Sequence, residues 1–124
     1  MTIEGLGFIT KCIEEMGIPY EFMEWTQDVS FPFFVGEYSE IEPLTEDGLE
    51  EGTFILTGTT TGKYMELETV KNTVKTYFGT EGMTAILESG SGIAISYGTS
   101  FPIPIDEQDI RRIQINLNVK EWRC

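Results

Sequence analysis

Residues 109–122 read DIRRIQINLNVKEW, and the other segments of the chain can be arranged around them. From Arg112 to Lys120 polar side chains alternate without a break with the apolar Ile113, Ile115, Leu117 and Val119. A period of two in a segment rich in β-branched residues predicts a β-strand with one face in a core and the other in water or at a polar interface. Such a strand needs partner strands on both edges and an apolar layer across its buried face.

Two amphipathic helices are predicted, over Thr2–Met16 and Leu67–Phe78. Their apolar residues recur three or four positions apart, at Ile3, Leu6, Ile9, Ile13 and Met16 in the first and at Leu67, Val70, Val74 and Tyr77 in the second. Gly17 and Gly79 follow the helices, and glycine suits the left-handed conformation just past a helix end. Because Gly5 and Gly7 weaken the first turn, we expect the first helix to start nearer Phe8.

The remaining segments predict strands and a connection. The expected strands are Ile18–Glu24, Phe31–Ile41, Gly52–Thr61, Met83–Leu87 and Gly92–Tyr97. Ser100–Asp106 contains Pro102 and Pro104, so it is expected at a sheet edge or as a connection. The order of elements predicts one small α+β domain over residues 1–124, with a mixed or mainly antiparallel sheet and two helices packed on one face.

The strand Phe31–Ile41 is apolar on both faces. Phe31, Phe33 and Val35 share one face, whereas Phe34 and Tyr38 share the other. Such a strand is either covered twice within its own domain or meets another subunit on one side. With two helices to cover the sheet, we expect Phe34 and Tyr38 to point away from the core and to form an oligomer interface.

The segment Glu40–Gly52 is rich in acids and turn residues and has no periodicity. It predicts an exposed loop whose Glu46, Asp47, Glu50 and Glu51 face a partner or a channel, or which simply connects two strands in solvent. These carboxylates do not have the spacing of an EF-hand, which argues against a calcium site.

The charge is uneven along the chain. The net charge is −13, and residues 1–62 contain 13 acidic and 1 basic side chain whereas residues 63–124 contain 8 and 7. An excess of this sign repels phosphate groups, which argues against a sequence-specific nucleic-acid reader and against binding to an anionic membrane surface. Solubility alone would also account for it. No apolar run is long enough to span a membrane, no secretory signal is visible, and the two cysteines fit a reducing compartment.

Several segments imitate chemical motifs without meeting their requirements. GTTTGKY at residues 58–64 has too few residues between its glycines for a phosphate-binding loop and ends in a tyrosine where Ser or Thr binds magnesium. The chain has no histidine, which removes the Ser-His and Cys-His nucleophile pairs and the commonest metal ligand. We therefore predict no catalytic residue, no cofactor and no metal site, and no enzymatic activity.

Three segments carry a resemblance to a known family. The strand FPFFV at residues 31–35 follows the first helix, the second helix follows a threonine-rich strand end, and the closing strand RRIQINL at residues 111–117 follows an acidic turn. In these features nearly the whole chain resembles the tail terminator, or tail-completion, proteins of long-tailed bacteriophages and prophages.

This resemblance implies a ring of six copies that caps the tail tube, stops its polymerisation and presents a surface to the head connector. The implied partners are further copies of the chain, the tail tube protein and a head connector or neck protein. The implied location is the tail–neck region of the virion, after assembly in the cytoplasm of the host bacterium. The acidic composition fits this role, because a channel that DNA traverses should not bind DNA.

Two other functions stay open. Another neck or head–tail connector component would have a similar compact fold and a different neighbour. An acidic inhibitor that mimics DNA would use the acidic half of the chain as its binding face. The inhibitor would be a monomer or dimer, whereas the terminator would form a ring.

Overall fold

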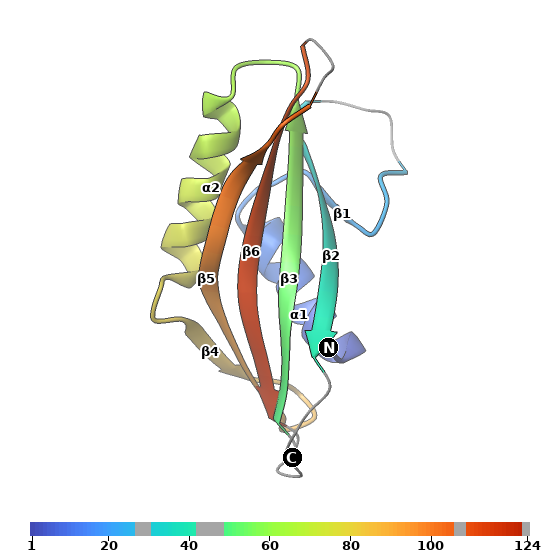
Figure 1. Cartoon of the computed structure of the whole chain (residues 1–124). Coiled ribbons are helices and arrows are strands. Elements are labelled where there is room, and N and C mark those ends of the chain that lie inside the picture. The colour runs from blue at the N-terminus through green and yellow to red at the C-terminus, as the bar shows by residue number, and fades with distance from the viewer. Residues whose placement is uncertain (27–30, 42–48, 106–108, 123–124) are drawn as a thin grey trace.

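The protein is described by a computed structural model, which covers residues 1–26, 31–41, 49–105 and 109–122 (Figure 1). Its elements, in chain order, are α1 (Ile3–Glu15), β1 (Tyr20–Phe22), β2 (Phe33–Ile41), β3 (Leu49–Thr60), α2 (Met65–Phe78), β4 (Met83–Ile86), β5 (Gly92–Ile103) and β6 (Arg111–Trp122). The six strands form one sheet, and both helices pack on the same face of it. The predicted small α+β domain with two helices on one face is confirmed.

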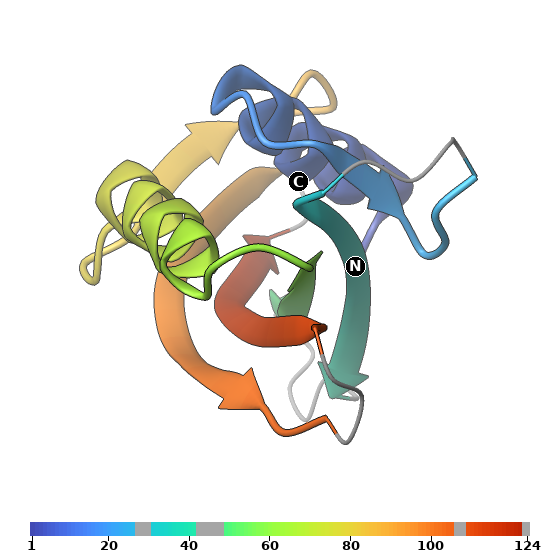
Figure 2. The same cartoon turned by 90° about the horizontal axis from the view of Figure 1, so that it is seen from above.

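The sheet is mixed, with the strand order β1-β2-β3-β6-β5-β4. β1 runs parallel to β2, and every other pairing is antiparallel. β6 lies between β3 and β5, so the strand of residues 111–122 has partners on both edges, as its pattern predicts. Figure 2 shows how strongly the sheet twists between its two edges, with α1 and α2 beside it.

The core lies between this sheet and the helices. β6 buries alternate residues, and the partner strands contribute theirs at matching positions, so that Leu117 pairs with Phe54 and Ile115 with Leu56. The helices cover this layer with side chains from one side of each, namely Ile9, Cys12 and Ile13 from α1 and Leu67, Val74 and Phe78 from α2. The apolar side chains that recur every second residue in the strands and every 3.6 residues in the helices therefore pack together in one layer.

The first helix starts earlier than its glycines suggested. α1 begins at Ile3, and Thr2 caps it because its hydroxyl accepts a hydrogen bond of 2.9 Å from the backbone N–H of Gly5. A Cβ at residue 5 would come within 2.6 Å of a carboxylate oxygen of Glu121. Gly5 thus allows the end of β6 to approach the helix. The low helix propensity of glycine suggested a later helix start and gave no indication of this close contact. Gly17 follows α1 with a φ of +74°, as predicted. Gly79 ends α2, also as predicted, but with a φ of +73° and a ψ of 166° it lies outside the left-handed helical conformation.

β5 is longer than its sequence indicated. It continues through Pro102 to Ile103, with an irregularity in its pairing between Tyr97 and Thr99. β4 pairs with β5 no further than Ile95, so in the described part of the chain Pro102 has a partner strand on one side only. The expectation that this proline-containing segment lies at a sheet edge is therefore confirmed. Among the helices described, none is long and apolar enough to cross a membrane.

Candidate functional site: the open face of the sheet

The prediction that Phe34 belongs to an oligomer interface is wrong. Phe34 is completely buried in the core of its own chain. Its ring occupies the space above its pairing partner Gly58, where a Cβ would come within 2.2 Å of a ring carbon. The two faces of β2 are therefore the reverse of those expected. Gly58, on the neighbouring strand β3, has no side chain and so makes room for the Phe34 ring. That Gly58 lies opposite Phe34 can be known only once the register of β2 and β3 is known.

Tyr38 lies on the same face of β2 as Phe34 but nearer the end of the strand. It is 40% exposed, and its ring stacks on Phe22 with the centroids 6.1 Å apart. This stacked pair lies at the sheet edge formed by β1 and β2. Tyr38 keeps an exposed aromatic surface, and its role in an oligomer interface stays a prediction.

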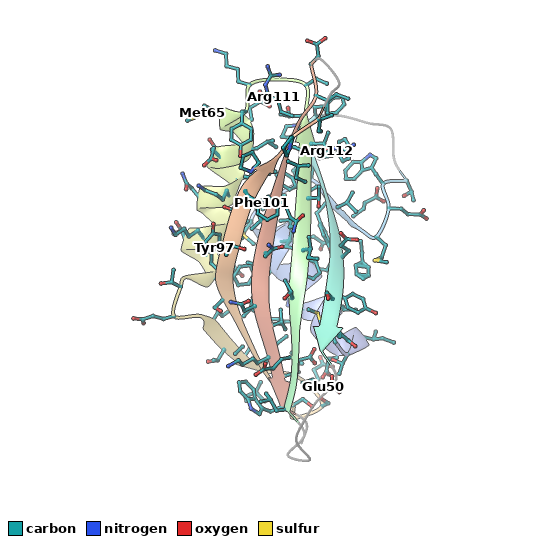
Figure 3. All side chains as sticks on the ribbon, in the orientation of Figure 1. Glu50, Met65, Tyr97, Phe101, Arg111 and Arg112 are labelled. Carbon is teal, nitrogen blue, oxygen red and sulfur yellow. The ribbon has the colours of Figure 1, made fainter. Side chains whose placement is uncertain are left out.

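Both ends of the predicted acidic loop belong to strands, since β2 reaches Ile41 and β3 begins at Leu49. Glu46 and Asp47 lie outside the described residues, whereas Glu50 and Glu51 belong to β3, so their assignment to a loop is wrong. Glu51 pairs with Ile41 on one side and with Lys120 on the other, and its carboxylate lies 3.9 Å from the Lys120 ammonium. Glu50 lies at the end of the molecule opposite Met65 and Arg111 (Figure 3). Pairing with β6 extends β3 through residues of low strand propensity.

No described helix or strand covers the face of the sheet opposite the helices, although Trp25, in the segment after β1, packs on Phe33 at one end of it, with the ring centroids 5.1 Å apart. We call this face the open face, and strand pairing places its residues in rows across β2, β3, β6 and β5. One row is Val35, Thr57, Gln114 and Phe101, and the next is Glu37, Ile55, Asn116 and Thr99. In Figure 3 the labelled Phe101 and Arg112 come from β5 and β6, near one end of the sheet.

Hydrogen bonds join the polar side chains in the middle of the open face. The Gln114 amide donates to the side-chain oxygen of Asn116 over 3.0 Å, and the Asn116 amide donates to the Thr99 hydroxyl over 3.1 Å. Gln114 and Asn116 lie two positions apart on β6, and Thr99 lies opposite Asn116 on the neighbouring strand β5. Part of the hydrogen-bonding capacity of this polar centre is therefore satisfied within the protomer.

Apolar side chains lie at both ends of the open face. At one end, Phe33 and Val35 from β2 and Phe101 and Ile103 from β5 lie on this side, and Phe101 is 46% exposed. At the other end, Trp122, Gly92 and Ile86 pair in one row across β6, β5 and β4. A hollow of about 350 Å³ lies beside this row, lined by Thr84, Ala85, Ile86, Gly92, Ile93 and Trp122.

Two groups with acid–base chemistry, the Cys12 thiol and the Tyr77 hydroxyl, lie near each other beside the core. Burial raises the pKa of the Cys12 thiol, which keeps it protonated near neutral pH, and a protonated thiol is a poor nucleophile. Tyr77 donates a hydrogen bond of 3.0 Å to Glu15, and its pKa is raised, mainly by its hydrogen bond with Cys12. Both groups lie on the helix side of the sheet.

A second hollow, of about 420 Å³, lies between α1 and the segment that follows β1. It is lined by Thr10, Glu14, Tyr20, Glu21, Phe22, Glu24 and Thr26. Thr26 donates two hydrogen bonds to the carboxylate of Glu21, of 2.7 Å from its backbone N–H and 2.6 Å from its hydroxyl. Within the residues the structure describes, no three His, Cys, Asp or Glu side chains gather in a way that could hold a metal ion.

The sequence matches no protein-family model and no curated protein. The open face is the side of the sheet that the described helices leave uncovered, and it is our candidate functional site.

Proposed function

We propose that this chain is a structural protein without enzymatic activity, which forms a ring of six copies at the end of the tail tube of a long-tailed bacteriophage or prophage. The ring stops the polymerisation of the tube and offers a surface to the head connector or neck protein. It assembles in the bacterial cytoplasm and stays at the tail–neck region of the virion.

The observation that carries this proposal is the open face. Its polar centre is hydrogen-bonded within the protomer, and apolar side chains such as Phe101 and Trp122 flank it. Exposed apolar groups around a polar sheet are typical of a surface that meets other protein chains. A protein whose function is to join subunits needs such a surface.

The charge of the chain supports the same proposal. With a net charge of −13, a ring of six copies would carry a large negative charge around its opening. DNA that leaves the head through the tail passes such an opening without being held, because like charges repel.

The test is to inactivate the gene in its phage and to examine the particles by electron microscopy. We expect tails longer than the normal length that do not join heads, and restoration of normal particles when the protein is supplied from a plasmid. Tails of normal length joined to filled heads would contradict the proposal. Tails of normal length that do not join heads would indicate another neck or connector component instead.

A test with purified proteins separates this function from that of a DNA-mimicking inhibitor. Added to polymerising tail tube protein, the chain should shorten the tubes and be found at one end of each tube. An inhibitor would leave the tubes unchanged and would instead block a DNA-binding enzyme.

A further inference from the structure

We propose that the open face is the surface on which a second copy of this chain packs. The proposal rests on the ring described above for the number of copies, but the surface itself is inferred from charge, hydrogen bonding and size. A closed ring of more than two copies needs head-to-tail contacts, so the open face of one copy meets a different surface of the next.

The first argument is electrostatic. Each copy has a net charge of −13, so two copies repel each other over most of their surface. Across β2, β3, β6 and β5 the two acidic side chains of the open face, Glu37 and Glu51, are balanced by two basic ones, Arg112 and Lys120. A further carboxylate, that of Glu21 on the edge strand β1 beside Val35, accepts two hydrogen bonds from Thr26. Glu51 and Lys120 already face each other across β3 and β6, 3.9 Å apart. The open face of these four strands is thus a neutral surface on an acidic protein, where another acidic copy can approach.

The charge of the outer surface of α1 and β1 differs from that of the open face. Glu14 and Glu15 lie exposed on α1, and Glu24 lies exposed just after β1, with Lys11 as the nearest basic residue in the sequence. A copy that approached this side would meet carboxylates of its own sign. Basic partners would prefer this acidic side, whereas a second acidic copy would prefer the neutral open face.

The second argument is that the open face can lose its water at a low cost. Burying a polar side chain is costly unless its hydrogen bonds are satisfied. Gln114, Asn116 and Thr99 already bond to one another, and the neighbouring Ser39, Thr53, Thr57 and Ser96 carry hydroxyls that can rotate to find partners. Glu37 and Asn118, in the same part of the face, would need partners on the second copy. The apolar groups at both ends, around Phe101 and Trp122, would gain free energy from burial.

The third argument is size. Four strands about 4.8 Å apart, each contributing about 35 Å of length, present roughly 600–700 Å² of sheet. A standard protein–protein interface buries about 800 Å² on each partner. The open face therefore has nearly the area that a stable contact between two copies requires.

The experiment places negative charge in the middle of the open face. Thr53 and Thr57 lie on the open face of β3, next to Asn118 and Gln114. In the double variant Thr53→Glu/Thr57→Glu, we expect the dissociation constant for self-association to rise at least about tenfold, because a like charge would be buried at the contact. Sedimentation velocity and light scattering measure the association, and circular dichroism and thermal unfolding check that the protomer stays folded.

The matched control is Thr76→Glu/Thr80→Glu. Thr76 is exposed on α2 and Thr80 is exposed just after that helix, so the control changes the same residue type and the same total charge on the helix side of the sheet, away from the open face. The control should associate as the wild type does. A milder pair, Thr53→Asn/Thr57→Asn, should also keep the association and would show that charge is responsible.

Three results would overturn the inference: an open-face variant that associates like the wild type, a control that loses association equally, or a wild type that stays monomeric both in solution and on tail tubes. The function is tested independently by the length of tails in the knockout. If the control and the open-face variant both complement the knockout, the open face is not the contact although the terminator function stands. If the knockout has normal tails but the variant alone loses association, the surface is right and the function is wrong.

Discussion

Thr2 donates two hydrogen bonds to the buried carboxylate of Glu121, one of 3.1 Å from its backbone N–H and one of 2.6 Å from its hydroxyl. Glu121 is 2% exposed, near the end of β6, and Thr2 is the N-cap of α1. The pair therefore fastens the first helix to the last strand. A carboxylate at a helix N-terminus accepts hydrogen bonds from free N–H groups, and its negative charge is attracted to the positive end of the helix dipole.

Replacing either member of this pair should destabilise the protein. We expect Thr2→Ala to cost about 1 kcal/mol, as the loss of an N-cap does. Glu121→Ala should cost about 2 kcal/mol, because it leaves the partly buried N–H and hydroxyl of Thr2 without their acceptor and opens space in a buried site. Urea denaturation of both single variants and of the double variant gives the interaction free energy between Thr2 and Glu121. A double variant whose loss equals the sum of the single losses would contradict a direct interaction.

The two glycines of α1 should respond oppositely to alanine. Gly7→Ala should stabilise the protein by about 0.5–1 kcal/mol, because alanine has the higher helix propensity and a Cβ at residue 7 would meet nothing within 4 Å. Gly5→Ala should destabilise it, because the new Cβ would lie 2.6 Å from a Glu121 oxygen and displace the carboxylate. Thermal unfolding measures both variants. Equal stabilisation by both would mean that Glu121 does not approach the helix as described.

The two faces of β6 should tolerate substitution differently. Ile115 is completely buried, so Ile115→Asn places an unpaired amide in the core and removes apolar volume, at a cost of about 3 kcal/mol or more. Asn116→Ile removes two hydrogen bonds on the open face and should cost about 1 kcal/mol or less. Equal losses in denaturation midpoint would refute the assignment of the faces.

β2 offers a test of the corrected orientation of its aromatic residues. Phe34→Asp should prevent folding, because it buries a carboxylate in the apolar core, whereas Tyr38→Asp should leave a folded protomer because Tyr38 is 40% exposed. Circular dichroism and solubility distinguish the two variants. A folded Phe34→Asp protein with normal stability would restore the original idea that Phe34 points away from the core.

Sequence patterning predicted the class of fold and much of its framework. The alternation in residues 112–120 identified a two-faced strand with neighbours on both sides, and the spacing of apolar residues identified both helices. These features are local, since a period of two or of 3.6 is set by backbone geometry within each element. The same pattern predicted only part of the open face. It placed Gln114 and Asn116 on the polar side of β6, but it did not predict which residues of β2, β3 and β5 lie beside them.

The sequence by itself determined which apolar residues of β6 are buried and that the chain forms one α+β domain, because alternation and helical spacing are set within each segment. It did not determine that Glu121 of β6 is buried. Only the tertiary structure decided which aromatic face of β2 is inside, where α1 begins and how far β3 extends. Each depends on a residue distant in the chain: Gly58 makes room for Phe34, Glu121 fills the space left by Gly5, and β6 pairs with β3 as far as Leu49. When both faces of a strand are apolar, its register with the partner strand decides which face is buried.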